Sequence, residues 1–167
     1  TPFRERIIER VIMKVLLAID GSEPSDIAVV EVSRRPWPEG TEVRIITVET
    51  PWTDDFSHGS SSNLFEEFNK HLRAKAWQML NDAAAVIRRN APCLIVSPVL
   101  RKGHPKDKIL DEAEQWGADL IVVGSHGYGA VRRLFLGSVS LAVATNAQCS
   151  VEIVRAPFHA ATEDSSP

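Results

Sequence analysis

The sequence Lys14-Val15-Leu16-Leu17-Ala18-Ile19-Asp20-Gly21-Ser22 contains the segment that decides the fold. Residues 14–19 form a short, almost wholly apolar run, which is typical of a strand that is buried on both faces. Asp20-Gly21-Ser22 then interrupts the run, and Ser25 or Asp26 can cap the helix that we expect next. A buried strand that leads into a helix favours an α/β protein.

The rest of the chain alternates between strand-like and helix-like segments. Further strands are expected at residues 42–48, 94–100, 120–123 and 151–154, and further helices at residues 64–90, 105–116 and 138–147. Pro98 indicates an edge strand or a bulge, and Gly117 suits the C-cap of a helix. The alternation predicts one doubly wound α/β domain, with a five-stranded, mainly parallel sheet and helices on both faces.

Composition limits what this domain can do. The 167 residues carry a formal net charge of −3, which argues against general affinity for nucleic acid or an acidic membrane surface. No apolar run approaches the roughly 20 residues of a membrane helix. Cys93 and Cys149 lie far apart in the sequence and form no CxxC motif. We expect them to be reduced thiols, which fits a cytoplasmic protein. We expect an N-terminal extension over residues 1–12, the domain over 13–156 and a flexible tail over 157–167.

A glycine-rich segment follows the fourth expected strand and is a candidate phosphate site. Gly124 ends the strand, Gly127 follows, and Gly137-Ser138 opens a helix. Backbone N–H groups in such a turn and at a helix N-terminus attract anions, and Ser138 and Ser140 add hydroxyl donors. A simple turn followed by a helix cap is the alternative interpretation.

Three expected strands end in residues that can join this site. Asp20, Val48 and Gly124 each lie at the carboxyl end of a strand, where open parallel sheets bind ligands. A turn or helix-capping role is the alternative for Asp20. Neither GxxxxGK[ST] nor a GxGxxG after the first strand is present, so a nucleotide would use neither standard phosphate loop.

The spacing Gly124, two residues, Gly127, nine residues, Gly137-Ser138 resembles the nucleotide motif of the ATP-binding universal stress proteins. The stretches Val-Leu-Leu-Ala-Ile-Asp-Gly-Ser (15–22) and Ile-Val-Val-Gly-Ser-His-Gly (121–127) are similar to that family's first and fourth strands, and residues 132–140 are similar too. The resemblance covers about residues 13–155. It implies an adenine nucleotide alpha-hydrolase-like fold and a stress-response protein that binds ATP, with Mg²⁺ as an optional companion.

The resemblance also implies roles for individual residues. Asp20 would bind the ribose hydroxyls, Ala18 would line the adenosine site, and Val48 would contact adenine. The phosphates would be held by Gly124, His126, Gly127, Gly137, Ser138, Val139 and Ser140. Tyr128 stands where the family often has a basic residue, which puts one phosphate contact in doubt.

The family often forms a homodimer by pairing the last strands of two copies. Glu152 interrupts the final apolar strand, where relatives usually carry an aliphatic residue. Together with Arg155, it could either tune or weaken such a pairing.

The sequence predicts no catalytic residues and no protein metal site. Its five histidines are scattered without metal-ligand spacing, and no serine stands in a GxSxG context. Asp107, Asp111, Glu112 and Glu114 are typical of a solvated helix face. We therefore expect a regulatory ATP-binding protein with at most slow ATP hydrolysis. An enzyme of adenylate or phosphoryl transfer, or a dimeric interaction module with an empty cleft, is the alternative.

Overall fold

The fold is seen in a computed structural model that describes residues 12–50, 62–126 and 136–155, with α3 side chains described from residue 66. Within these ranges the elements follow in the order β1 (Lys14–Ala18), α2 (Glu23–Arg34), β2 (Glu42–Glu49), α3 (Ser62–Asn90), β3 (Ile95–Lys102), α4 (Pro105–Trp116), β4 (Leu120–Gly124), α5 (Ser138–Asn146) and β5 (Ser150–Val154). The predictions for the N-terminal extension, the tail, Gly127 and Tyr128 lie outside the described residues.

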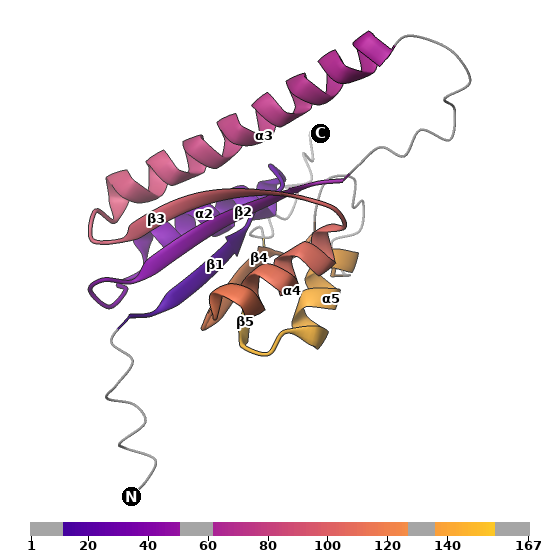
Figure 1. The fold of residues 1–167 in the computed structure, drawn as a ribbon. Helices are drawn as coiled ribbons and strands as arrows, with labels where there is room; N and C mark the ends of the chain where they lie inside the picture. Colours follow the sequence, from indigo (N-terminus) through magenta and orange to yellow (C-terminus); the bar gives the residue numbers. More distant parts are fainter. Residues whose placement is uncertain (1–11, 51–61, 127–135, 156–167) are drawn as a thin grey trace, which may run out of the picture.

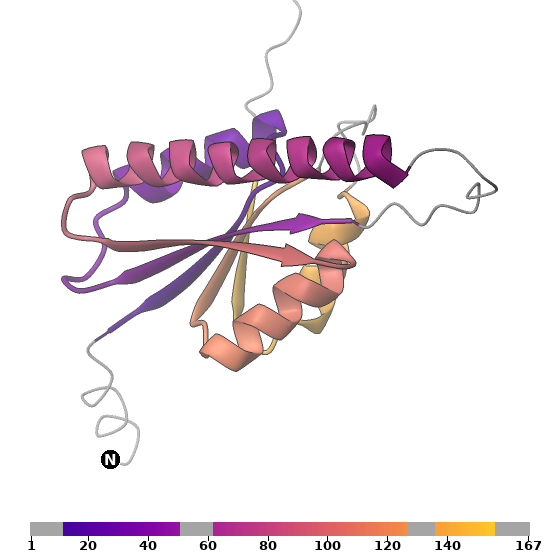
Figure 2. The same cartoon turned by 45° about the horizontal axis from the view of Figure 1, so that its top comes forward.

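The described strands form one sheet in the order β3-β2-β1-β4-β5 (Figures 1 and 2). Every neighbouring pair is parallel, and the central strand β1 aligns Leu17 with Ile45 of β2 and with Val122 of β4. The chain adds strands to one side of β1 as far as β3 and then to the other side with β4 and β5. This strand order confirms the doubly wound α/β fold. β3 lies at an edge of the sheet, as Pro98 predicted.

Helices cover both faces of the sheet, as expected. α2 and α3 lie on one face and α4 and α5 on the other (Figure 1). Val15 and Leu17 of β1 belong to the first core, whereas Leu16 and Ala18 belong to the second. Because successive side chains of a strand point to opposite faces, the unbroken apolar run of β1 serves both cores.

The predicted cap of α2 is wrong. The helix begins at Glu23 with Ser22 at the N-cap, so Ser25 already lies in its first turn, where its Oγ donates to the carbonyl of Ser22 at 2.9 Å. Pro24 explains the earlier start, because its fixed φ and missing N–H suit the first turn of a helix. The C-cap prediction for α4 is confirmed, since Gly117 has φ 71°.

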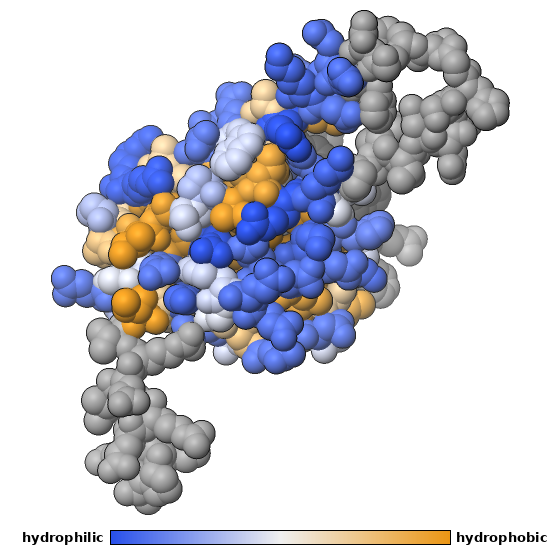
Figure 3. Space-filling model, viewed as in Figure 1, coloured by the Kyte–Doolittle hydropathy of each residue, from blue (hydrophilic) through white to orange (hydrophobic). Residues whose placement is uncertain are grey.

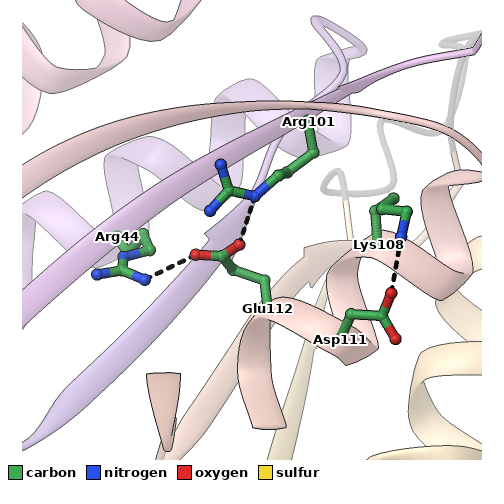
Figure 4. A network of polar contacts seen from close by, with 5 residues as sticks. All are labelled: Arg44, Arg101, Lys108, Asp111 and Glu112. Atoms are coloured by element: carbon green, nitrogen blue, oxygen red, sulfur yellow. Dashed lines mark hydrogen bonds and ion pairs between the residues drawn. The ribbon is translucent and has the colours of Figure 1, made fainter. Parts of the chain in front are cut away.

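The expected solvated face of α4 is also wrong in one position. Glu112 is only 4% exposed and lies between α4 and the sheet. Arg44 of β2 binds its Oε1 at 2.6 Å, and Arg101 of β3 binds its Oε2 at 2.7 Å (Figure 4). The spacing of acidic residues along one helix does not reveal which cations the strands beneath it supply.

Glu152 in the middle of β5 also has a cationic partner. Arg35, the residue after α2, donates to its two carboxylate oxygens from Nη1 and Nη2, each at 2.6 Å. These hydrogen bonds lower the pKa of Glu152 against the opposing effect of burial, and they raise the pKa of Arg35. A carboxylate is tolerated in this strand because its charge is neutralised by a partner that directly follows α2.

We expect the Arg35–Glu152 pair to make stability depend on pH in acid. Since folding lowers the pKa of Glu152, the pair stabilises the fold above the ordinary glutamate pKa of about 4.3, and this contribution is lost as pH falls through the lowered value. The side chains are 34% and 32% exposed, which limits the contribution to about 1 kcal/mol. In urea unfolding, Glu152→Gln should be less stable than the wild type at pH 7 and close to it at pH 3. An equal difference at both pH values would contradict the assignment.

Candidate functional site

A cleft of about 460 Å³ lies where β1, β2 and β4 end. This volume falls in the range of about 300–1,000 Å³ that is usual for small-molecule sites. The cleft is lined by nine of the ten residues expected to bind nucleotide, namely Ala18, Asp20, Val48, Gly124, His126, Gly137, Ser138, Val139 and Ser140. The tenth, Gly127, lies outside the described residues.

Other lining residues were missed by the sequence analysis. They come from the same strand ends and from α2, α3 and α4: Ile19, Ser22, Ser25, Ile46, Thr47, Met79, Pro105, Ile109 and Val123. Alternation could have found Ile46, which lies on the same face of β2 as Val48. Nothing in the local sequence indicates that α3 and α4 supply side chains to the cleft.

One end of the cleft is apolar. Ala18, Ile46 and Ile109 are buried in the core beneath α4 and α5, and Val48 and Val139 pack partly buried against them. These side chains come from β1, β2, α4 and α5. The fold thus places aliphatic walls where a flat apolar group could be held.

Asp20 lies just beyond β1 with an exposed side chain. Its Oδ1 accepts a hydrogen bond from the backbone N–H of Ser22 at 3.0 Å, so the turn role is confirmed. Its Oδ2 has no hydrogen-bond partner among the described residues. Thr47 steadies the preceding residue, because its Oγ1 donates to the carbonyl of Ile19 at 2.6 Å. The carboxylate is therefore held at the cleft with one oxygen available to a ligand.

The start of α5 is tied to the end of β4. The Gly137 N–H donates to the carbonyl of Ser125 at 2.8 Å, and the Ser140 hydroxyl donates to the carbonyl of Gly124 at 2.6 Å. The Ser140 hydroxyl thus does not direct its hydrogen into the cleft, contrary to expectation. The first-turn N–H groups of Ser138, Val139 and Ser140 have no acceptor within the helix, and they carry the positive end of its dipole.

His126 is oriented by its neighbours on both sides. Its Nδ1 lies 3.0 Å from the Oγ of Ser125, and its carbonyl accepts a hydrogen bond from the Ser22 hydroxyl at 3.3 Å. The second contact links the end of β4 to the N-terminus of α2. His126 therefore belongs to the framework of the cleft as well as to its lining.

Gly124 is required by the fold itself. A Cβ at this position would lie 2.9 Å from the backbone N of Ser25 and 3.0 Å from the carbonyl carbon and Cβ of Pro24. Gly124 was expected to help hold the phosphates, and the structure shows that it also allows the close approach of α2.

Comparison with known proteins agrees with this geometry. The model of the universal stress protein family matches residues 12–155. The chain belongs to the universal stress protein family. A universal stress protein of Thermus aquaticus is 33% identical over 144 residues, which cover 84% of this chain and 97% of the relative. The resemblance predicted from the glycine spacing is confirmed.

Solved universal stress proteins share the fold. One, in complex with cAMP, has a TM-score of 0.64 at 23% identity and covers 86% of this chain and 96% of its own. Another, from Arabidopsis thaliana with AMP bound, has a TM-score of 0.59 at 19% identity and covers 87% of this chain and 92% of its own.

A wider groove of about 690 Å³ adjoins the cleft of this universal stress protein. It lies between α2 and α3 and shares Ile19, Asp20 and Met79 with the cleft. Among the described residues that line this groove, none belongs to β2, β4 or α5. The ligand site expected at the strand ends is therefore the smaller cleft.

Two further observations concern metals and membranes. Among the described residues, no three His, Cys, Asp or Glu side chains gather closely enough to hold a metal ion. Over the same part of the chain, every helix is too short or too polar to span a bilayer.

Proposed function

We propose that this universal stress protein binds ATP in the cleft and acts as a regulatory protein of the cytoplasm. The observation that carries the proposal is the convergence of nine expected residues, from three strand ends and one helix N-terminus, in one cleft of suitable volume. The solved relatives with cAMP and AMP bound support an adenine nucleotide as the ligand class.

The two ends of the cleft suit the two ends of a nucleotide. Val48 and Ala18 would pack against adenosine at the apolar end, and Asp20 would accept hydrogen bonds from the ribose hydroxyls. The first-turn N–H groups of α5, which begins directly after Gly137, would receive the phosphates. An ionised carboxylate accepts hydrogen bonds from hydroxyl groups, and the N–H groups at a helix N-terminus donate to anions such as phosphate.

Backbone groups would supply most of the attraction for phosphate. No lysine or arginine is among the described residues that line the cleft. Asp20 is the one carboxylate among these residues, and Mg²⁺ at nucleotide sites usually combines one or two carboxylates with phosphate oxygens and waters. Mg²⁺ would therefore be held mainly by the oxygens of the triphosphate, and Gly124, His126, Ser138, Val139 and Ser140 would shape the space around it.

We also propose a homodimer paired along β5. The sheet has two edge strands, β3 and β5. Pairing of a second chain along β3 is disfavoured by Pro98 in the middle of the strand and by Arg101 and Lys102 at its end. Figure 3 shows this side of the molecule, with apolar surface between α3 and α4. β5 contains neither proline nor lysine, and the charge of Glu152 is neutralised by Arg35. The β5 edge is thus the better template for antiparallel pairing with a second copy.

Native mass spectrometry of gently purified protein would test both proposals at once. We expect a species of twice 18.5 kDa that carries up to one adenine nucleotide on each chain, with occupancy rising when Mg²⁺ and ATP are added. Absence of bound nucleotide at millimolar ATP would contradict the binding proposal. A monomer at every concentration would contradict the dimer, and multiple-turnover release of ADP or AMP would contradict a purely regulatory role.

A further inference from the structure

The buried carboxylate of Glu112 has no part in the nucleotide contacts described above. It projects from α4 toward the sheet, where guanidinium groups from two neighbouring strands meet it (Figure 4). Arg44 reaches it from β2 and Arg101 from β3, with one carboxylate oxygen for each. One side chain thus joins α4 to both strands.

Stability alone does not account for this cluster. Burial of charge is costly, and an apolar residue of similar size usually stabilises such a position at least as well as an ion pair. The Nε of Arg44 is buried without a hydrogen-bond partner in the described part of the chain, which is a further cost. Unlike an apolar contact, the cluster fixes the orientation of α4 relative to the two strands, because each carboxylate oxygen must meet a particular N–H group.

Arg44 holds α4 at a second point, one turn beyond Glu112. Its guanidinium carbon lies 4.3 Å from the centroid of the Trp116 ring. Lys14 of β1 lies 5.5 Å from the same ring and donates from Nζ to the Trp116 carbonyl at 3.2 Å. The C-terminal half of α4 is therefore fixed to β1, β2 and β3 by charged groups.

The opposite half of α4 forms a wall of the cleft. Ile109, three residues before Glu112 and 4% exposed, lines the apolar end together with Pro105. Ile46 and Val48 line it too, and they follow Arg44 at alternate positions on the same face of β2. β2 therefore binds Glu112 and also lines the apolar end of the cleft together with Ile109, and we call this apolar end the apolar slot.

We propose that Glu112 is a positioning residue that sets the width of the apolar slot and thereby the affinity for the adenine base. The inference rests on the proposed function, since it assigns the slot to adenine. Glu112 acts through the position of α4 and touches no ligand. Loss of its charge would leave one arginine without an acceptor and would let α4 move relative to β2.

The test compares Glu112→Gln with Asp111→Asn by calorimetric titration of ATP and of adenosine. Asp111 is the adjacent acidic residue of α4, exposed and paired with Lys108 at 2.8 Å, so it is a matched control. We expect Glu112→Gln to weaken both ligands by the same factor, roughly tenfold, because only the base end of the cleft changes. Asp111→Asn should stay within about twofold of the wild type.

A second variant keeps the inference testable if the Glu112→Gln protein does not fold. Arg101→Gln removes the more exposed of the two partners and should weaken both ligands in the same direction, by roughly threefold. Wild-type affinity in both variants would overturn the inference. A loss much greater for ATP than for adenosine would also overturn it, because it would show a general loosening that reaches the phosphate end. A wild-type protein that binds neither ligand would overturn the proposed function itself, and this inference with it.

Discussion

Replacement of Gly124 by alanine is expected to lower the melting temperature by roughly 5–10 °C and to weaken ATP binding at the same time. The new methyl group would lie 2.9 Å from the backbone N of Ser25 and 3.0 Å from two atoms of Pro24. Backbone atoms at the start of a helix cannot rotate away, so α2 would have to shift as a unit. Because Ser22 and Asp20 precede that helix and line the cleft, the shift would reach the ligand site.

Gly40→Ala is the control for Gly124→Ala. A methyl group at Gly40 would have no atom within 4 Å, so any loss of stability there comes only from its φ of +78°. We expect Gly40→Ala to lower the melting temperature without changing the affinity for ATP. Calorimetric melting and ATP titration of both variants would decide the matter. A Gly124→Ala protein with wild-type stability and affinity would show that α2 yields without cost.

Asp20→Ala is expected to reduce ATP affinity by roughly 100-fold, because it removes the charged acceptor that we propose for the ribose hydroxyls. The fold should be little affected, since the side chain is exposed and forms one turn hydrogen bond, to the Ser22 N–H. Asp26→Asn, an acidic residue in the first turn of α2 that lies outside the cleft, is the control and should bind ATP as the wild type does.

The assignment of Asp20 to the ribose can be separated from a general effect of charge. Dideoxy-ATP lacks both ribose hydroxyls, so it should bind the wild type weakly and bind Asp20→Ala with nearly the same affinity. Isothermal titration of the two ligands against the two proteins gives the coupling directly. If Asp20→Ala weakened ATP and dideoxy-ATP by the same factor, the ribose role would be wrong.

Local patterns predicted the elements of this fold because each pattern reflects the surroundings of its own segment. The run from Val15 to Ile19 indicated a strand covered on both faces, and Pro98 indicated an edge. Helix spacing in residues 64–90 predicted α3, although Phe68 and Leu72, which fit its apolar stripe, remain 50% and 38% exposed. Periodicity shows that residues share a face but not whether the sheet is long enough to cover it.

The sequence by itself determined the strands, their parallel arrangement, the glycine-rich segment and the family, because these depend on local patterns and on spacing along the chain. Only the tertiary structure decided which charges are neutralised and which walls close the cleft. In the sequence Glu112 stood among other acidic residues of one helix and Glu152 stood in an apolar strand. Arg44 is 68 residues from Glu112 and Arg35 is 117 residues from Glu152, although Arg101, the second partner of Glu112, is only 11 residues from it. The role of Gly124 was decided in the same way, by contact with a helix about one hundred residues earlier in the chain. Ion pairing and steric exclusion act over a few ångströms of space, whatever the distance along the chain.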